Sequence, residues 1–216
     1  MDRPGVDARE FRANFDDIEL ANRRFGGSRP VTREIISRAS SGETFGVLDV
    51  GCGSGDIARD LVRVAPVPVT VVALDSNAEI LAIARERTPE ALPITFVRGD
   101  GGALPYDDAS FDIAMCNLAL HHFEPPAAIA MLRELRRVSR VTPLVCDLVR
   151  SRSGFIAAWL FARILAKNRL TKHDGPLSVR RAYTPGEALA LARDAGWRAP
   201  RVVRHPFFRM VLTDGI

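Results

Sequence analysis

Cysteine is scarce in this sequence, and its few thiols follow no pairing pattern. The 216 residues include three, Cys52, Cys116 and Cys146, with no C-x-x-C motif. An odd number of widely spaced cysteines argues against both a disulfide framework and a thiolate zinc site. No cluster of acids and histidines has metal-ligand spacing either, so we expect no bound metal. Free buried thiols indicate a reducing, cytoplasmic compartment.

Long apolar runs are absent as well. No run reaches the ~18 residues of a membrane span, and residues 1–10 are too polar and charged for a signal peptide. At 47 % hydrophobic and 26 % charged residues, the composition is that of a globular domain with a substantial core. The net charge of +4 is weak evidence for a nucleic-acid partner, and none is expected.

A glycine-rich stretch is the most informative motif present. Residues 49–55 read D-V-G-C-G-S-G, after an apolar run and before a helical pattern. Glycine lets a ligand approach bare backbone, and the following helix offers free N–H groups at its first turn. Asp56 replaces the last glycine of the dinucleotide fingerprint, where its charge would repel a pyrophosphate. The stretch therefore favours a nucleoside ligand without phosphates over NAD, with an ordinary α/β turn as the alternative.

Strand and helix patterns alternate through the middle of the chain. Apolar, β-branched runs predict strands at 47–51, 69–75, 94–100, 111–117 and 141–148. Amphipathic stretches between them predict helices at 55–64, 77–87 and 125–139. This alternation predicts an α/β fold with a doubly wound, Rossmann-like sheet that is mainly parallel.

The whole of 1–216 is expected to form a single domain with four parts. Helices over residues 1–40 form an N-terminal cap on a cofactor-binding core at 45–150. Residues 151–182 form a substrate lid, with an apolar helix at 155–170 and a loop at 172–176. Residues 183–216 supply a last helix and an antiparallel hairpin, which brings the sheet to seven strands.

Polar residues close three of the expected strands. Asp75 and Asp100 end the second and third, and Asn117 ends the fourth. The carboxyl ends of parallel strands meet at one edge of the sheet, where such folds bind ligands. A carboxylate at Asp75 suits the two hydroxyls of a ribose, and one at Asp100 suits the amino group of a base. Alternatively, both acids serve as helix or turn caps.

In this order and spacing, the motifs resemble those of a class I S-adenosylmethionine-dependent methyltransferase. The resemblance rests on the glycine stretch, Asp75, residues 99–101 and residues 117–122, and spans about 45–150. The chain is similar to the small-molecule branch that includes ubiquinone and menaquinone methyltransferases. The resemblance implies S-adenosylmethionine as cofactor and S-adenosylhomocysteine as product. The cofactor-binding residues that it implies are Asp49, Gly51, Cys52, Gly53, Gly55, Asp75, Ser76, Asp100, Gly101, Asn117 and His122.

An acceptor that is not already ionised needs a base, and histidine suits that role near neutral pH. His121 and His122 follow the fourth strand, and His173 lies in the expected lid loop. Tyr183 is a further candidate. Neighbours in an extended segment face opposite ways, and His122 is slightly preferred of the two. Structural roles for these histidines remain the alternative.

The methyl acceptor is expected to be small and largely apolar. No Asn/Asp-Pro-Pro-Tyr segment follows the fourth strand, which argues against nucleobase or amide N-methylation. Aromatic residues of the lid helix, with Phe11, Phe15 and Phe25, suit an aromatic hydroxyl or ring carbon of a polyketide-, phenol- or quinone-like compound. An RNA or protein methyltransferase and a non-catalytic binding protein are the alternatives. Basic residues flanking the apolar helix within 150–172 would also suit peripheral contact with a membrane.

Overall fold

The computed structural model describes residues 8–24, 27, 29–39, 44–164 and 168–215. A seven-stranded sheet with the order β3-β2-β1-β4-β5-β7-β6 runs through it. The strands are β1 (Phe45–Val50), β2 (Val69–Asp75), β3 (Ile94–Arg98), β4 (Phe111–Asn117), β5 (Ser139–Leu148), β6 (Pro200–His205) and β7 (Arg209–Asp214). Strands β1 to β5 are parallel, whereas β7 is antiparallel to β5 and β6. The predicted doubly wound sheet with its closing hairpin is confirmed.

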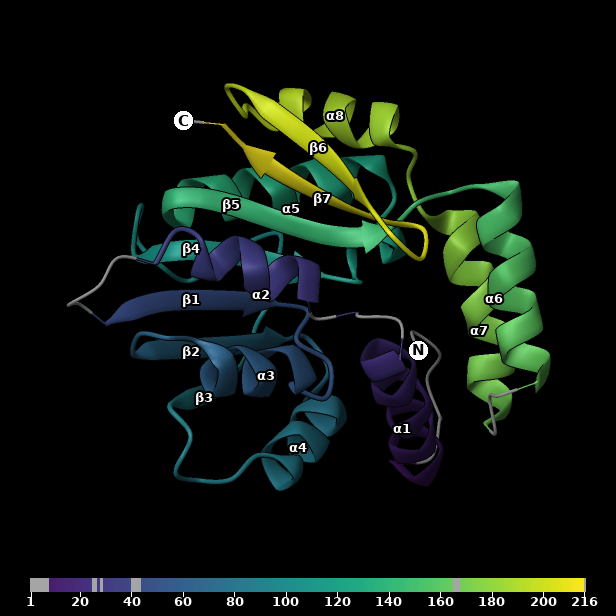
Figure 1. The fold of residues 1–216 in the computed structure, drawn as a ribbon. Helices are drawn as coiled ribbons and strands as arrows, with labels where there is room; N and C mark the ends of the chain where they lie inside the picture. The colour runs from purple at the N-terminus through teal and green to yellow at the C-terminus, as the bar shows by residue number, and fades with distance from the viewer. Residues whose placement is uncertain (1–7, 25–26, 28, 40–43, 165–167, 216) are drawn as a thin grey trace.

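Helices cover both faces of this sheet and stand beyond one end of it (Figure 1). They are α1 (Ala8–Arg24), α2 (Arg29–Ile36), α3 (Asp56–Val64), α4 (Ala78–Arg87), α5 (Pro125–Val138), α6 (Arg152–Ile164), α7 (Arg169–Arg181) and α8 (Pro185–Asp194), with a short 3-10 helix η1 (Leu120–His122). In Figure 1, α1, α6 and α7 lie past the arrowheads of the central strands. None of the helices so described is long and apolar enough to cross a bilayer.

The core has two layers because successive strand residues point to opposite faces. On one face Val47 and Leu144 pack under α2 and α3. On the other, Leu48 and Val145 pack under α5 and α8. Strands covered on both faces need apolar residues at nearly every position, which explains the unbroken apolar runs of the sequence.

Two helix caps agree with the predicted starts. Asn77 Oδ1 accepts hydrogen bonds from the N–H groups of Glu79 (2.9 Å) and Ile80 (3.3 Å), which begins α4 directly after β2. Thr184 and Glu187 form a reciprocal capping box at α8. The first cap leaves Asp75 at the very end of its strand, facing the space beyond the sheet.

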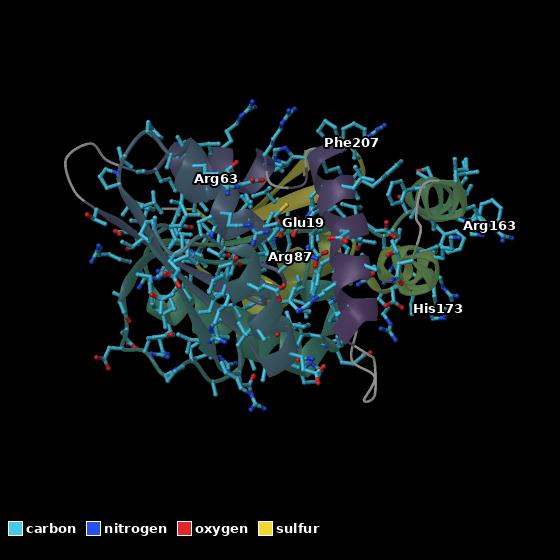
Figure 2. All side chains as sticks on the ribbon, turned by 90° about the horizontal axis from the view of Figure 1, so that it is seen from below. Glu19, Arg63, Arg87, Arg163, His173 and Phe207 are labelled. Carbon is cyan, nitrogen blue, oxygen red and sulfur yellow. The ribbon has the colours of Figure 1, made fainter. Side chains whose placement is uncertain are left out.

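One carboxylate of the N-terminal helix α1 makes three contacts with the core. Glu19 Oε1 accepts hydrogen bonds from Ser54 Oγ (2.9 Å), Arg59 Nη2 (3.1 Å) and Arg87 Nη1 (3.0 Å). Figure 2 shows Glu19 and Arg87 side by side near the centre of the molecule. Because Ser54 belongs to the glycine stretch, this cluster ties the cap to the loop. Phe11 and Phe15 are buried against α4, while Phe25 lies outside the described residues.

The lid differs from its prediction. One helix over 155–170 and a loop over 172–176 were expected, whereas α6 ends at Ile164 and α7 runs from Arg169 to Arg181. Gly175 and Pro176, the apparent loop signals, lie inside α7. A proline removes one helical hydrogen bond, but α7 packs against α6, α1 and η1 and buries Pro176. Tertiary packing thus overrides the local signal.

Candidate active site

A cavity of about 850 Å³ lies at the carboxyl ends of the parallel strands. Its walls come from the glycine stretch, the ends of β2 and β4, helix α1, the α6–α7 lid and the β6–β7 turn. The predicted ligand edge of the sheet, the cap and the lid therefore enclose one site. The predicted cofactor residues in the cavity wall are Asp49, Gly51, Cys52, Gly53, Asp75, Ser76, Asp100, Gly101, Asn117 and His122.

The glycine stretch takes a backbone conformation that other residues adopt at a cost. Gly51, Gly53 and Gly55 have left-handed φ angles of 74°, 53° and 74°. A Cβ at Gly51 would lie 2.9 Å from the Cβ of Ala119, after β4, and one at Gly55 would lie 3.0 Å from the Phe96 ring. Gly55 itself is not among the wall residues of the cavity. Its role is to shape the turn into α3.

Asp75 braces this loop from the end of β2. Its Oδ2 accepts a hydrogen bond from the Gly53 N–H (3.1 Å), and its Oδ1 accepts one from the Asn77 N–H (3.0 Å). Asp100 closes the turn after β3, where its Oδ1 accepts from the Gly102 N–H (2.8 Å). Both acids thus shape backbone and also face the cavity. The functional and the capping interpretations of these residues are compatible.

Asp49 is the most deeply buried acid of the cavity wall. It is 1 % exposed, and its Oδ2 contacts no hydrogen-bond donor in the described part of the chain. Burial raises its pKa to about 8, and the charges of Asp56 and Asp75 add to the shift. The Oδ1 atom of Asn117, on the neighbouring strand, is buried with no described partner as well. Two unsatisfied acceptors at adjacent strand ends fit a cationic ligand group.

His121 forms a buried pair with an acid that sequence reasoning missed. Its Nδ1 lies 2.7 Å from Asp147 Oδ1, and its backbone N–H donates to Asp147 Oδ2 (2.9 Å). Burial by itself would raise the pKa of Asp147, but His121 and the backbone N–H groups of His121 and Leu148 lower it overall. His121 lies in the cavity wall. The one sequence signal for Asp147 was that it is the only acid in strand β5, after the apolar run 143–146.

The other candidate bases are placed differently. The His122 ring also borders the cavity, with its centroid 4.3 Å from that of His121. His173 is not in the expected loop: it is exposed on α7, pairs with Asp174 (3.0 Å) and is not among the wall residues. Tyr183 donates its hydroxyl hydrogen to the Phe123 carbonyl (2.7 Å) and is likewise outside the wall. The geometry brings together His121 and His122.

A second missed residue is Arg209, which begins β7. It lies in the cavity wall, is 6 % exposed and donates from Nη2 to Asn22 Oδ1 (3.3 Å). Its Nε and Nη1 atoms have no acceptor among the described residues. Burial lowers its pKa, and the neighbouring Cys146, Asp147 and Asp56 offset this in part. The cavity wall therefore contains one buried guanidinium whose Nε and Nη1 hydrogens could be donated to a ligand.

The three thiols are all free and buried, as the sequence indicated. Burial raises the pKa of Cys52 and Cys116 well above the ordinary thiol range and that of Cys146 to about 12. Cys52 also borders the cavity. A thiol with a raised pKa stays protonated near neutrality and is a poor nucleophile. Covalent cysteine chemistry is therefore not indicated at this site.

Comparisons with known proteins agree with this geometry. Residues 47–141 match the model of a family described as a methyltransferase domain. A 2-phytyl-1,4-naphtoquinone methyltransferase of Synechococcus elongatus is 29 % identical over 188 residues, which cover 81 % of this chain and 80 % of that protein. A demethylmenaquinone methyltransferase of Roseiflexus castenholzii is 30 % identical over 187 residues, which cover 79 % and 74 %.

Coverage is not uniform among the similar proteins. An uncharacterised 37.1 kDa protein of transposon TN4556 from Streptomyces fradiae is 30 % identical over 72 % of this chain, but the match spans 44 % of that protein. Among solved structures, a SAM-dependent methyltransferase from Aquifex aeolicus superposes with a TM-score of 0.68 over 96 % of this chain and 97 % of that one. Its sequence identity is 19 %, so this likeness concerns the fold.

Proposed function

Because the chain belongs to the class I S-adenosylmethionine-dependent methyltransferases, we propose that it methylates a small, largely apolar acceptor. The acceptor is an aromatic hydroxyl or ring carbon of a quinone-, phenol- or polyketide-like compound. The observation that carries this proposal is the buried His121–Asp147 pair in the wall of the cavity that also contains the glycine stretch. The names of the two quinone methyltransferases support the acceptor class.

The residues of the wall suit each part of the cofactor. Bound S-adenosylmethionine supplies an electrophilic methyl group beside a positive sulfur. Asp49 Oδ2 and Asn117 Oδ1, without described donors, would receive the cationic methionyl end. Asp75 would accept from the ribose hydroxyls, and Asp100 with the Gly101 backbone would hold the adenine. The glycines with positive φ angles have no side chains, which leaves room for the cofactor to approach the backbone of the loop.

His121, rather than the initially preferred His122, is the base that we propose. The Nδ1–H group of His121 donates a hydrogen bond to the Asp147 carboxylate. The Nε2 lone pair is then available to take up the proton of the acceptor hydroxyl. The carboxylate then stabilises the imidazolium that forms, as in other acid–histidine pairs. General-base catalysis of this kind contributes about 10²- to 10⁴-fold.

Orientation of the acceptor falls to the apolar part of the wall. Phe15 of α1, Phe161 of α6 and Phe208 of the β6–β7 turn border the cavity. Aromatic walls exclude water and hold a flat acceptor by contact area. Holding two reactants in near-attack geometry is worth about 7–11 kcal/mol.

Methyl transfer to a defined acceptor tests the proposal. The full chain is incubated with methyl-labelled S-adenosylmethionine and, separately, with a reduced short-chain naphthoquinol, a simple phenol and total RNA. We expect label in the organic extract of the naphthoquinol or phenol reaction. Label in RNA or in protein alone would contradict the acceptor class, and S-adenosylhomocysteine added in excess serves as the inhibition control.

Replacing Asp75 tests the ribose assignment. Asp75→Ala is expected to weaken S-adenosylhomocysteine binding by ~1–3 kcal/mol, because hydrogen bonds to a charged group are lost. The loop contact to Gly53 is lost in the same variant. Isothermal titration calorimetry measures the change, with the exposed Asp107→Ala as matched control. An unchanged affinity in Asp75→Ala would refute the assignment.

A further inference from the structure

We propose that the outer face of the lid and the β6–β7 turn dock on an anionic membrane surface, beside the mouth of the cavity. We call this surface the docking face; it comprises Ile156, Trp159, Leu160 and Ile164 of α6 with Phe207 and Phe208 of the turn. The inference deepens the proposed function, since an apolar acceptor would then reach the cavity from the lipid. The vesicle test below needs no turnover, so its failure and that of the acceptor assignment are distinguishable.

Helix α6 is apolar on two opposite sides. Ala158 and Phe161 face the cavity. The opposite side exposes Ile156 (57 %), Trp159 (44 %), Leu160 (44 %) and Ile164 (73 %). Spacings of three and four residues put these side chains on one stripe. A helix that is apolar all round is normally covered on every side, and no described element covers this stripe.

The β6–β7 turn carries bulky residues in a costly conformation. Phe207 and Phe208 have φ angles of 59° and 57°, in the left-handed region that favours glycine. Gly, Asn and Asp are the usual residues at turn positions with positive φ, and none of them occurs among the three residues, 206–208, that connect β6 to β7 here. Both phenylalanines are nevertheless exposed, by 55 % and 38 %, so burial in the core does not explain them. Strained residues at the edge of a site point to a function there.

The turn and α6 are continuous around the cavity. Phe207 and Phe208 both border it, and a Cβ at Gly154, near the start of α6, would lie 3.1 Å from the Phe208 ring. In Figure 2, Phe207 and Arg163 both lie at the periphery of the molecule. The two apolar parts therefore flank one opening rather than forming separate patches.

The charged residues of α6 and α7 favour an anionic partner for the docking face. Helix α6 has no acid, and Asp174, which pairs with His173, is the acid of α7. Among the side chains of these two helices that the structure describes, the exposed cations are Arg152, Arg163, Lys172, Arg180 and Arg181. Arg163 lies over the Trp159 ring at 5.2 Å, an arrangement suited to the boundary between headgroups and acyl chains. Cations around an apolar stripe match an anionic lipid surface, whereas RNA would leave the aliphatic side chains uncovered.

Vesicle co-sedimentation tests the docking face with the full chain. Vesicles of phosphatidylcholine alone are compared with vesicles containing about one third phosphatidylglycerol. We expect at least tenfold tighter binding to the anionic vesicles. Trp159→Gln with Leu160→Gln should lower that binding at least tenfold, and Arg152→Gln with Arg163→Gln should remove the preference for anionic lipid. Val64→Gln is the matched control, since Val64 is 57 % exposed on α3, which lies away from α6 and α7 (Figure 1).

The variants also provide folding and activity controls. Neither Trp159 nor Leu160 borders the cavity, so S-adenosylhomocysteine binding and methylation of a water-soluble acceptor should be unchanged. Absence of vesicle binding in the wild type, with intact S-adenosylhomocysteine binding, would overturn the docking face and leave the methyltransferase assignment untouched. Equal loss in Val64→Gln, tighter binding to RNA than to anionic vesicles, or a dimer in solution that Trp159→Gln dissociates would overturn it too.

Discussion

Asp49→Asn is expected to lose cofactor affinity and gain stability at the same time. A buried carboxylate with one oxygen that has no described donor is costly in the free protein and valuable to a cationic ligand. Loss of its hydrogen bonds to a charged group corresponds to about 10- to 100-fold weaker S-adenosylhomocysteine binding. Calorimetry measures this change. The exposed Asp107→Asn is the control, and an unchanged affinity in Asp49→Asn would remove Asp49 from the cofactor site.

The pH dependence of binding gives an independent readout. The pKa of Asp49 is about 8 in the free protein, and the ionised form binds a cation better. Binding below that pH therefore releases a proton, so the affinity of the wild type rises with pH and levels off above about 8. Titrations in two buffers with different ionisation enthalpies report the proton release. Asp49→Asn should lack this component.

The free energy of unfolding should fall as pH rises, whereas the cofactor affinity should rise. The folded-state pKa of Asp49, about 8, lies above its ordinary value of 3.8, so the native state binds the extra proton between these values. The stability that this extra proton contributes is fully present below pH 3.8 and is lost as the pH rises to about 8. Asp49→Asn removes the dependence, so its Tm advantage over the wild type should be larger at pH 9 than at pH 5. A Tm difference that does not vary with pH would contradict the assignment.

His121→Ala is the second variant with a large expected effect. Loss of the general base should lower kcat by about 10²- to 10⁴-fold, with S-adenosylhomocysteine affinity little changed. Steady-state kinetics with a phenol that is neutral at the assay pH measures the loss. His173→Ala, on the outer side of α7, should retain the wild-type rate, and His122→Ala should lose less than His121→Ala.

A comparison of neutral and ionised acceptors distinguishes loss of the general base from damage to the fold. A nitro-substituted phenol that is already ionised needs no base, so it should recover most of the rate of His121→Ala. Asp147→Asn, which perturbs the positioning of His121, should behave in the same way. An equal loss for the neutral and the ionised acceptor would show that the pair supports the fold rather than the proton transfer.

Much of the fold could be predicted because its signals are local. The strands of the core are covered on both faces, so each reads as an apolar run with a recognisable end. Asn77 and the Thr184–Glu187 box begin their helices through hydrogen bonds that span only a few residues. The lid was the exception, since Gly175 and Pro176 read as a loop and lie in α7. Packing on three neighbouring elements outweighed the lost hydrogen bond, and no local pattern reports such packing.

The cofactor-binding residues could be predicted from the sequence and the catalytic pair could not, again because only local signals can be read from a sequence. The glycine stretch and Asp75 are short motifs next to strand ends, so the sequence by itself determined their place at the ligand edge of the sheet. The partner of His121 lies 26 positions away in β5, and Asn22 and Arg209 are separated by 187. Such pairs arise when distant segments meet, and burial then decides their chemistry. Tertiary structure alone therefore placed Asp147 against His121, Arg209 in the cavity wall and the two phenylalanines of the β6–β7 turn at its edge.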